Sequence, residues 1–537
     1  MKRFLLWLDT RRLATAILFV ALFAMAVRTP TDTDTWWHLQ AGRVTLESGH
    51  ILQADLFSHT RYGSHWVNQS WLSQVILYWL FDCFSYAGLG LWMGAVVTAA
   101  FAFVYLQMEG GPFTRAFIVV LAAATSAVIW VARPQLLSFL LTAVVAYVLY
   151  LFKWRGVNRL WLLPPLFVLW VNLHAGYALG FMVLVAFVAG EVLNHLLALV
   201  APPFLPPVGG DRGETQTAPT PGPSPNSGGG GGFPPRIGGD REGADPVVDW
   251  RGIGLVVGVA VLSVLLLVVN PNTTRMWTYY LETVRIGVLQ DFIQEWQSPD
   301  FHLLYTQPFI WMLLATLAAM GLSGRRADCT DLVMVGMFAY AALLAGRNFA
   351  PFALVTAPVL SRHVAAALAR WGWSARSRPR LDLRTRTVLG AVNLWLLALI
   401  VALAMVKVWT PLNIAFNEQK QRESLPVDAV AWIRQQRPAG EMFNPYNWGG
   451  YLIWALWPDY RVFVDGRTDL YGDEFLRQYL DVQRARPGFE ETLAAYGVNL
   501  VLTYPDDALS VQLACAGGWE EVYRDEVAVV WVREETG

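Results

Sequence analysis

The chain has 537 residues, of which 55% are hydrophobic and 15% are charged, and its formal net charge is -1. Soluble domains carry about a quarter charged residues, so this composition excludes an ordinary soluble protein. The near-neutral charge argues against a nucleic-acid partner. The three cysteines, Cys83, Cys329 and Cys515, are scattered without metal-ligand spacing and predict neither a zinc site nor a disulfide framework.

Apolar runs long enough to cross a bilayer recur along the chain. The first follows a basic start at residues 1–12. We interpret it as an uncleaved span, because no small-residue cleavage site precedes a soluble domain. The eleven candidate spans cover residues 13–28, 87–107, 116–131, 134–152, 160–175, 177–200, 252–269, 307–323, 331–346, 349–369 and 388–408. The shorter run 70–83 contains Asp82 and favours a helix lying in the membrane interface.

The distribution of lysine and arginine sets the expected orientation. With eleven spans, the basic connections fall on one side, which the positive-inside rule makes cytoplasmic. These residues include Arg11, Arg12, Arg115, Lys153, Arg155, Arg159, Arg325, Arg326 and the arginines between 370 and 386. A span at 70–83 would move Lys153 and its neighbours outside. We therefore predict a multi-pass plasma-membrane protein with loops 29–86 and 270–306 on the non-cytoplasmic side.

The chain divides into a membrane domain, residues 1–410, and a tail, residues 411–537. Within the first, residues 205–247 are rich in Gly and Pro and predict a disordered cytoplasmic insertion. The tail has soluble composition and predicts a small external α/β domain. We expect helices at 427–435, 473–484 and 489–496, and strands at 461–465, 498–504 and 527–532.

The first external loop opens with an acidic and aromatic cluster. Asp32 and Asp34 follow the first span directly, and Trp36, Trp37 and His38 come next. A carboxylate at this place can hold a divalent cation or act as a general base. Alternatively, Asp32 caps the next helix and the tryptophans anchor the interface. The residue types alone leave both interpretations open.

The second external loop carries Asp291 and Glu295, four residues apart. One helix would place both on the same face, and together with Asp34 they could form a cation site of hard oxygen ligands. A solvated helix in a loop would show the same pattern.

Further polar residues stand at span ends on the same side: Arg133, Asn172 with His174, and Arg347 with Asn348. Polar groups at membrane depth are costly, which favours a function. An arginine facing an external cavity could neutralise a phosphate, and Arg347 is the stronger candidate because apolar sequence resumes directly behind it. Snorkelling of a terminal arginine to the headgroups is the alternative.

The tail contains the run Tyr446-Asn447-Trp448-Gly449-Gly450-Tyr451. Paired glycines between aromatic residues indicate backbone packed closely against a ligand or a neighbouring segment. Val464-Asp465-Gly466-Arg467-Thr468-Asp469 follows an expected strand and is typical of a turn. Both runs could serve the fold alone.

Taken together, these segments resemble the GT-C superfamily of membrane glycosyltransferases, and most of all the catalytic subunit of oligosaccharyltransferase. Asp34-Thr35-Trp36-Trp37-His38 is similar to that family's acidic motif after its first span. Ile293-Gln294-Glu295 is similar to its TIxE or SVxE motif, and the run 446–451 is a loose counterpart of its WWDYG motif. ARPQ stands where a second acidic motif would be expected, and the tail motif lacks the aspartate.

The resemblance implies a polytopic helical membrane fold and transfer of a sugar from a polyprenyl-phosphate-linked donor. It implies Asp34 and Glu295 as catalytic residues that also hold a divalent cation, Mg²⁺ or Mn²⁺. Donor phosphate would bind near Arg347, and Asp34 would activate or orient the acceptor. The other residues expected to bind substrate are Asp32, His38, His174, Asn348, Trp448 and Tyr451.

Membrane lipid and the lipid-linked donor are the expected partners. The alternative is a non-catalytic or transport protein that binds lipid or partners. Transporters usually show internal repeats and charged or broken mid-membrane helices, and we find neither pattern in the sequence.

Overall fold

The computed structural model describes residues 2–200, 245–373 and 382–534, so the predicted insertion lies outside the described residues apart from 245–247. Each of the eleven predicted runs contains one helix, which confirms the polytopic helical fold. The helices are α2 (Thr10–Ala26), α4 (Trp71–Gln107), α5 (Pro112–Ser126), α6 (Gln135–Trp154), α7 (Leu163–Leu173), α8 (Tyr177–Val200), α9 (Trp250–Leu266), α12 (Gln307–Leu322), α13 (Cys329–Leu344), α14 (Phe349–Arg370) and α15 (Leu383–Leu412). Short α1 (Lys2–Trp7) precedes them.

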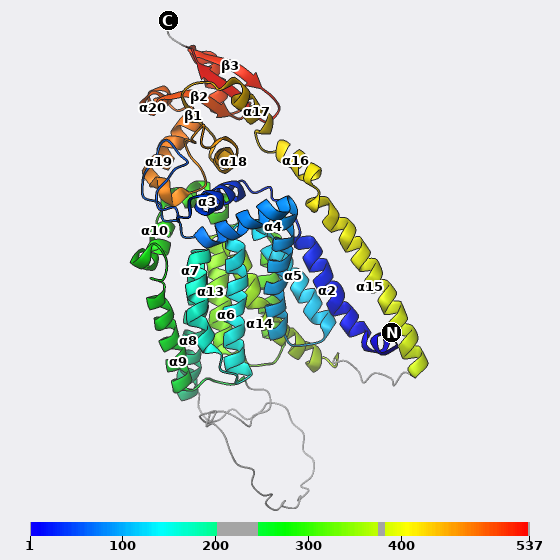
Figure 1. Ribbon diagram of the computed structural model, residues 1–537. Helices are drawn as coiled ribbons and strands as arrows, with labels where there is room; N and C mark the ends of the chain where they lie inside the picture. The colour runs from blue at the N-terminus through cyan, green and yellow to red at the C-terminus, as the bar shows by residue number, and fades with distance from the viewer. Residues whose placement is uncertain (1, 201–244, 374–381, 535–537) are drawn as a thin grey trace, which may run out of the picture.

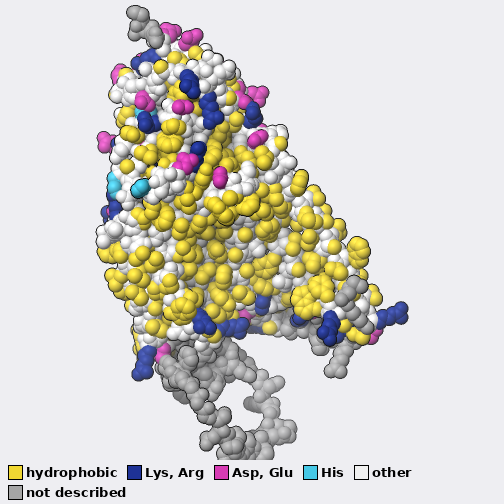
Figure 2. Space-filling view, in the orientation of Figure 1, with side chains coloured by type: hydrophobic (Ala, Val, Ile, Leu, Met, Phe, Trp, Pro, Cys, Tyr) yellow, Lys and Arg dark blue, Asp and Glu magenta, His cyan; other side chains and the backbone are white. Residues whose placement is uncertain are grey.

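Within the described part of the chain, six helical segments are long and apolar enough to cross a membrane by length and composition, and four shorter ones are also apolar. Figure 2 shows hydrophobic side chains over the middle of the molecule, with charged side chains gathered towards its two ends. Such an apolar surface is suited to contact with lipid.

The interfacial helix predicted at 70–83 is the first part of α4. The helix breaks at Ser85, whose backbone has φ 53° and ψ -144°. The break allows the first part to lie across the end of the bundle while the second part runs along it (Figure 1). A side chain on Gly88 would collide with the carbonyl oxygen of Leu80, so the turn needs glycine there.

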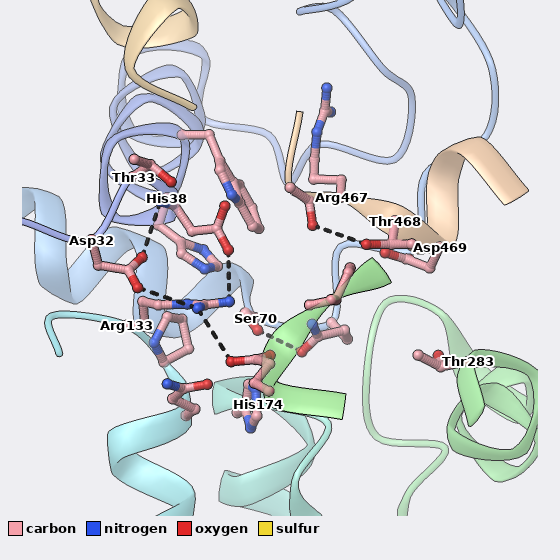
Figure 3. Close-up of a pocket in the computed structure, with 18 of the residues that line it drawn as sticks. Asp32, Thr33, His38, Ser70, Arg133, His174, Thr283, Arg467, Thr468 and Asp469 are labelled. Carbon is pink, nitrogen blue, oxygen red and sulfur yellow. Dashed lines mark hydrogen bonds and ion pairs between the residues drawn. The ribbon is translucent and has the colours of Figure 1, made fainter. Parts of the chain in front are cut away.

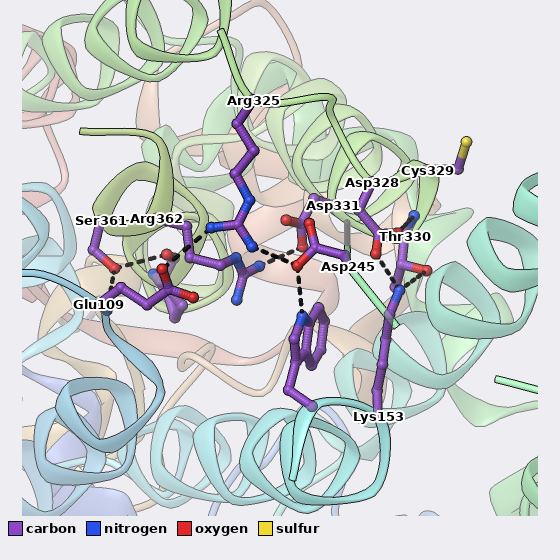
Figure 4. A network of polar contacts seen from close by, with 12 residues as sticks. Glu109, Lys153, Asp245, Arg325, Asp328, Cys329, Thr330, Asp331, Ser361 and Arg362 are labelled. Atoms are coloured by element: carbon purple, nitrogen blue, oxygen red, sulfur yellow. Dashed lines mark hydrogen bonds and ion pairs between the residues drawn. The ribbon is translucent and has the colours of Figure 1, made fainter. Parts of the chain in front are cut away.

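Buried ion pairs join the helices of the bundle (Figure 4). The Lys153 ammonium on α6 lies 2.5 Å from both Glu191 on α8 and Asp328 beside α13. Arg362 on α14 pairs with Asp331 on α13 at 2.5 Å. These side chains are almost fully buried, so each charge depends on its partner.

The second loop that the sequence predicts to be external, residues 270–306, contains short helices only. They are η3 (Thr273–Trp277), α10 (Tyr279–Val284), α11 (Gly287–Phe292) and η4 (Gln294–Trp296). Other short 3-10 turns are η1 (Ala127–Ile129), η2 (Leu160–Leu162) and η5 (Gly346–Asn348).

The tail forms a small α/β unit. Its sheet has the order β1-β2-β4-β3, with β1 parallel to β2 and the other pairs antiparallel. The strands are β1 (Glu441–Phe443), β2 (Val498–Thr503), β3 (Trp519–Arg524) and β4 (Val529–Arg533). The helices are α16 (Ile414–Arg422), α17 (Val427–Gln436), α18 (Tyr446–Leu456), α19 (Thr468–Gln483), α20 (Phe489–Ala495) and α21 (Ala508–Ala516).

The strand predicted at 461–465 does not join this sheet, which corrects the sequence analysis. Val462 instead donates its N–H to the carbonyl of Phe57 at 3.0 Å and accepts from the N–H of His59 at 3.1 Å. The segment is extended because its backbone partners come from the first external loop. The contact links the tail to that loop.

A buried ion cluster also joins these two regions. The Arg467 guanidinium lies 2.7 Å from Asp55 of the first loop and 2.7 Å from Asp465 of the tail. Tyr471 donates its hydroxyl to Asp465 at 2.6 Å. Each charge therefore has a buried partner, and the tail is held in one position over the loop.

The orientation of the tail can be tested with the native cysteines, because Cys515 is exposed and Cys329 is buried. In a Cys83→Ser variant, a membrane-impermeant thiol reagent should label Cys515 in intact cells, since the lysine and arginine distribution predicts an external tail. A cysteine at position 220, in a background lacking Cys83 and Cys515, should react only after permeabilisation. The opposite pattern would reverse the predicted orientation.

Lys153→Met tests the buried ion pairs. The change leaves Glu191 and Asp328 without their cation, and breaking a buried pair costs about 3–5 kcal/mol. We expect a large drop in the thermal denaturation midpoint of the purified protein. Lys420→Met, which removes an exposed pair with Glu423, is the matched control and should be near neutral. Equal midpoints for both variants would contradict the role of Lys153.

Candidate functional site

A polar cavity of about 650 Å³ lies where the tail meets the bundle. The first loop, the turn before α6, the second external loop and the tail all contribute to its wall (Figure 3). The predicted site residues that line it are Asp32, Asp34, His38, His174, Glu295 and Arg347. Arg133, Tyr446, Asn447, Arg467 and Asp469 line it as well.

Asp34 is the first residue of α3 (Asp34–Ser48), at the end of the helix that favours negative charge. The Asp32 carboxylate accepts the N–H of Asp34 at 3.0 Å, so Asp32 supports the start of this helix. Gly466 of the tail packs so closely on the Asp34 carboxylate that a side chain there would collide with it. The tail backbone therefore confines Asp34.

Arg133 lies among three carboxylates. Its guanidinium nitrogens are 2.6 Å from Asp34, 3.4 Å from Asp32 and 3.8 Å from Glu295. Several of the dashed lines in Figure 3 end on the Arg133 side chain. Since these residues come from three separate segments, one guanidinium brings the acidic groups of both external loops together.

The two predicted catalytic carboxyls have opposite electrostatics. Burial raises the pKa of Asp34 to about 6, with Asp32 and Glu295 adding to the effect and Arg133 opposing it. Burial also raises the pKa of Glu295, but Arg133 and Arg347 outweigh it and hold that pKa below its ordinary value. Asp34 is thus the carboxyl suited to exchange a proton near neutral pH, while Glu295 stays ionised.

Glu295 sits on η4, next to Arg347 on η5. The Arg347 guanidinium lies 4.0 Å from the centre of the Trp296 ring, and Gly346 donates its N–H to the Gln297 carbonyl at 3.2 Å. The expected shared helical face of Asp291 and Glu295 is wrong. The chain is extended at Ile293 between α11 and η4, and Asp291 pairs instead with Arg477 at 3.2 Å.

Both predicted histidines line the cavity. Burial, followed by the charge of Arg133, holds the pKa of His38 well below its ordinary value, so this ring is neutral. His174 Nδ1 accepts the N–H of Gly176 at 3.0 Å and is 2.8 Å from Ser138 Oγ. That nitrogen therefore acts as acceptor, which leaves the proton on Nε2 of His174.

Three residues expected to bind substrate lie outside this cavity. Trp448 is buried in the tail with its ring 4.1 Å from that of Tyr504, and Tyr451 packs edge-on against Trp36. Asn348 donates its amide to the Ala341 carbonyl at 2.9 Å.

Trp448 and Tyr451 lie outside the cavity because α18 presents only its first turn, Tyr446 and Asn447, to it. Side chains on the paired glycines would collide with Val464 at Gly449 and with Thr33 at Gly450. The glycines therefore allow α18 to pack against neighbouring backbone.

The cavity also contains residues that the sequence indicated only weakly or not at all. Arg133 stood out only as an end-of-span arginine. Asp469 accepts the hydroxyl of Tyr279 at 3.0 Å at the cavity wall, and burial raises its pKa. In the sequence, only the turn predicted at 464–469 pointed to the segment that carries Asp469 to the cavity wall.

A second cavity, of about 600 Å³, shares Gln294, Glu295 and Arg347 with the first. Arg28 and Phe349 line it, together with residues that follow α2 and α5 and precede α12 and α14. Glu295 and Arg347 therefore stand between two spaces, one below the tail and one at the ends of four bundle helices.

The divalent cation implied by the resemblance does not fit these residues. Among the described residues, no group of three or more His, Cys, Asp and Glu side chains could hold a metal ion. The expected ligands, Asp34 and Glu295, face the permanently charged Arg133 instead. A cation between them would be repelled by the guanidinium.

Comparison with known proteins gives matches among solved structures only; neither models of known families nor curated proteins match this chain. The oligosaccharyltransferase AglB from Archaeoglobus fulgidus, in complex with an inhibitory peptide and a dolichol-phosphate, matches with TM-score 0.55 and 10% identity. The match covers 98% of this chain and 75% of that one.

The apo form of the Archaeoglobus fulgidus oligosaccharyltransferase gives TM-score 0.53 and 11% identity, covering 99% of this chain and 75% of that one. Apo ArnT from Cupriavidus metallidurans gives TM-score 0.47 and 13% identity, covering 96% and 97%. At these identities the likeness is one of fold alone, and the chain shares the fold of these oligosaccharyltransferase structures, as its short motifs predicted.

Proposed function

We propose that this protein transfers a sugar from a polyprenyl-phosphate-linked donor to an acceptor on the non-cytoplasmic face of the membrane. One observation carries the proposal: Asp34, Glu295 and Arg347, from three separate segments, line one polar cavity, and Glu295 and Arg347 also line the second. A group-transfer reaction needs such a place, because donor and acceptor must approach one reacting centre from different sides.

The second cavity is the proposed donor site. Arg28 and Arg347 line it, and arginine guanidinium groups match the geometry of phosphate oxygens. Its position at the ends of α2, α5, α12 and α14 suits a lipid that keeps its chain in the bilayer. The similar AglB structure contains a dolichol-phosphate, which supports a lipid-linked phosphate here.

The polar cavity below the tail is the proposed acceptor site. Asp34 would take the proton of the acceptor's attacking group, which forms the new bond to the anomeric carbon of the sugar. The bond from that carbon to the phosphate oxygen breaks, and the polyprenyl phosphate departs with the electron pair. Attack opposite the leaving group inverts the anomeric centre.

Electrostatics supports this division of roles. The charge that develops on the leaving phosphate would be stabilised by the nearby Arg347, a fixed positive group that needs no rearrangement. Glu295, ionised and close to Arg133 and Arg347, would orient these two arginines and balance the positive charge that develops on the sugar. His38, His174 and Asp32 line the same wall and would bind or position the acceptor.

Asp34→Asn and Glu295→Gln test the assignment. Each is nearly isosteric, and loss of one electrostatic contact to a reacting centre costs on the order of a hundredfold in rate. The assay follows sugar release from a panel of polyprenyl-phosphate-linked sugars in reconstituted liposomes. Asp291→Asn is the matched control, because Asp291 lies in the same loop but pairs with Arg477 outside the cavity. Near-normal turnover in both isosteric variants would remove the catalytic assignment.

The rate should also depend on pH through Asp34. With a pKa of about 6, Asp34 is mainly ionised above pH 6 and protonated below it. Only the ionised form can accept a proton, so kcat/KM should be level above the pKa and fall about tenfold per pH unit below it. A profile that stays level down to pH 5 would show that Asp34 is not the base.

A further inference from the structure

The cluster around Arg133 gathers three like charges in a partly buried site. Three carboxylates, from Asp32, Asp34 and Glu295, lie within 4 Å of one guanidinium. Their side chains are between 17% and 35% exposed, so water screens them only in part. Like charges this close repel strongly unless a cation lies between them.

Arg133 is held in place by its own turn. Its N–H donates to the carbonyl of Val131 at 2.8 Å, and its carbonyl accepts the N–H of Leu136 at 3.1 Å in the first turn of α6. Thr35 of α3 donates its hydroxyl to the carbonyl of Ala132 at 3.2 Å. The turn that carries Arg133 is therefore fixed to the helix that carries Asp34.

We infer that Arg133 is the resident cation of this site and takes the place that a divalent metal ion would need. A guanidinium stays protonated at any physiological pH and offers five N–H donors in one plane, so it can hold several carboxylates at once. In this arrangement Arg133 positions Asp34 towards the acceptor cavity and Glu295 towards the junction with the donor cavity. Its part in the reaction rests on the proposed function, while its place among the carboxylates does not.

The place of Arg133 among the carboxylates can be tested by metal binding, without any turnover. With Arg133 in place these carboxylates do not form a group that could hold a metal ion. Removal of the guanidinium frees them to turn towards the vacated volume, and carboxylate oxygens are the ligands that Mg²⁺ and Mn²⁺ prefer. Arg133→Ala should therefore create a divalent cation site in a protein that has none there. The wild-type protein should be indifferent to metal ions.

The test is titration of the purified full-length protein in detergent with MnCl₂, with bound Mn²⁺ followed by electron paramagnetic resonance and the denaturation midpoint recorded in parallel. Wild type should show no saturable site in the cluster and no change of midpoint with Mn²⁺ or EDTA. Arg133→Ala should gain one saturable site and a midpoint that rises with Mn²⁺. The double variant Arg133→Ala with Asp34→Asn should lose that site.

Arg347→Ala is the matched control, because Arg347 lines the same cavity but has no ion pair within 4 Å among the described residues. It should not gain the site. Saturable Mn²⁺ binding by wild type that Asp34→Asn abolishes would overturn the inference. A folded Arg133→Ala protein without a gained site would also overturn it. Arg133→Gln serves the same test if the alanine variant does not fold.

These readouts separate the inference from the proposed function. Binding and denaturation are measured without a donor, so a wild-type protein that transfers no sugar would refute the function and leave the metal test standing. If turnover is found, it should persist after dialysis against EDTA. If chelation abolishes turnover and Mn²⁺ restores it, Arg133 does not replace a metal ion, whereas the proposed sugar transfer is supported.

Discussion

The architecture of the site depends on the buried ion cluster of Arg467 with Asp55 and Asp465. All three side chains are at most 1% exposed, and a buried charge that loses its partner is strongly destabilising. The cluster therefore fixes the tail over the first external loop. Gly466, next to Arg467, then packs against the Asp34 carboxylate, so that the docking contact and the candidate site share one stretch of chain.

Charged neighbours also set the properties of the carboxyl groups in the cavity. Asp34 and Glu295 contact one guanidinium, yet their pKa values move in opposite directions. Burial raises both, but two like charges add to it at Asp34, whereas Arg133 and Arg347 together outweigh it at Glu295. Environments that separate two carboxyls in this way give one a role in proton transfer and the other a fixed charge. Arg133 makes that separation possible by joining groups from both external loops.

The sequence by itself determined the membrane fold. Apolar runs of span length have no stable alternative to helices in lipid, because the backbone must satisfy its own hydrogen bonds there. This is why each predicted run contains a helix, and why a separate helical segment before Ser85 could be anticipated from Asp82 and the shortness of the run 70–83. Arg347 could be singled out because polar groups at span ends are costly, and Asp34 and Glu295 because their surroundings resemble motifs of a known superfamily.

Only the tertiary structure decided which residues share a cavity. The extended segment at 461–465 pairs with the first loop, about four hundred positions away in the sequence. No local sequence pattern could predict that pairing. Trp448 and Tyr451 turn into the packing of α18, whereas Tyr446 faces the cavity, because helix rotation is set by the glycine contacts with neighbouring backbone. In the sequence Arg133 looked like an arginine at the end of a membrane span. Only the folded structure shows that it lies among three carboxylates.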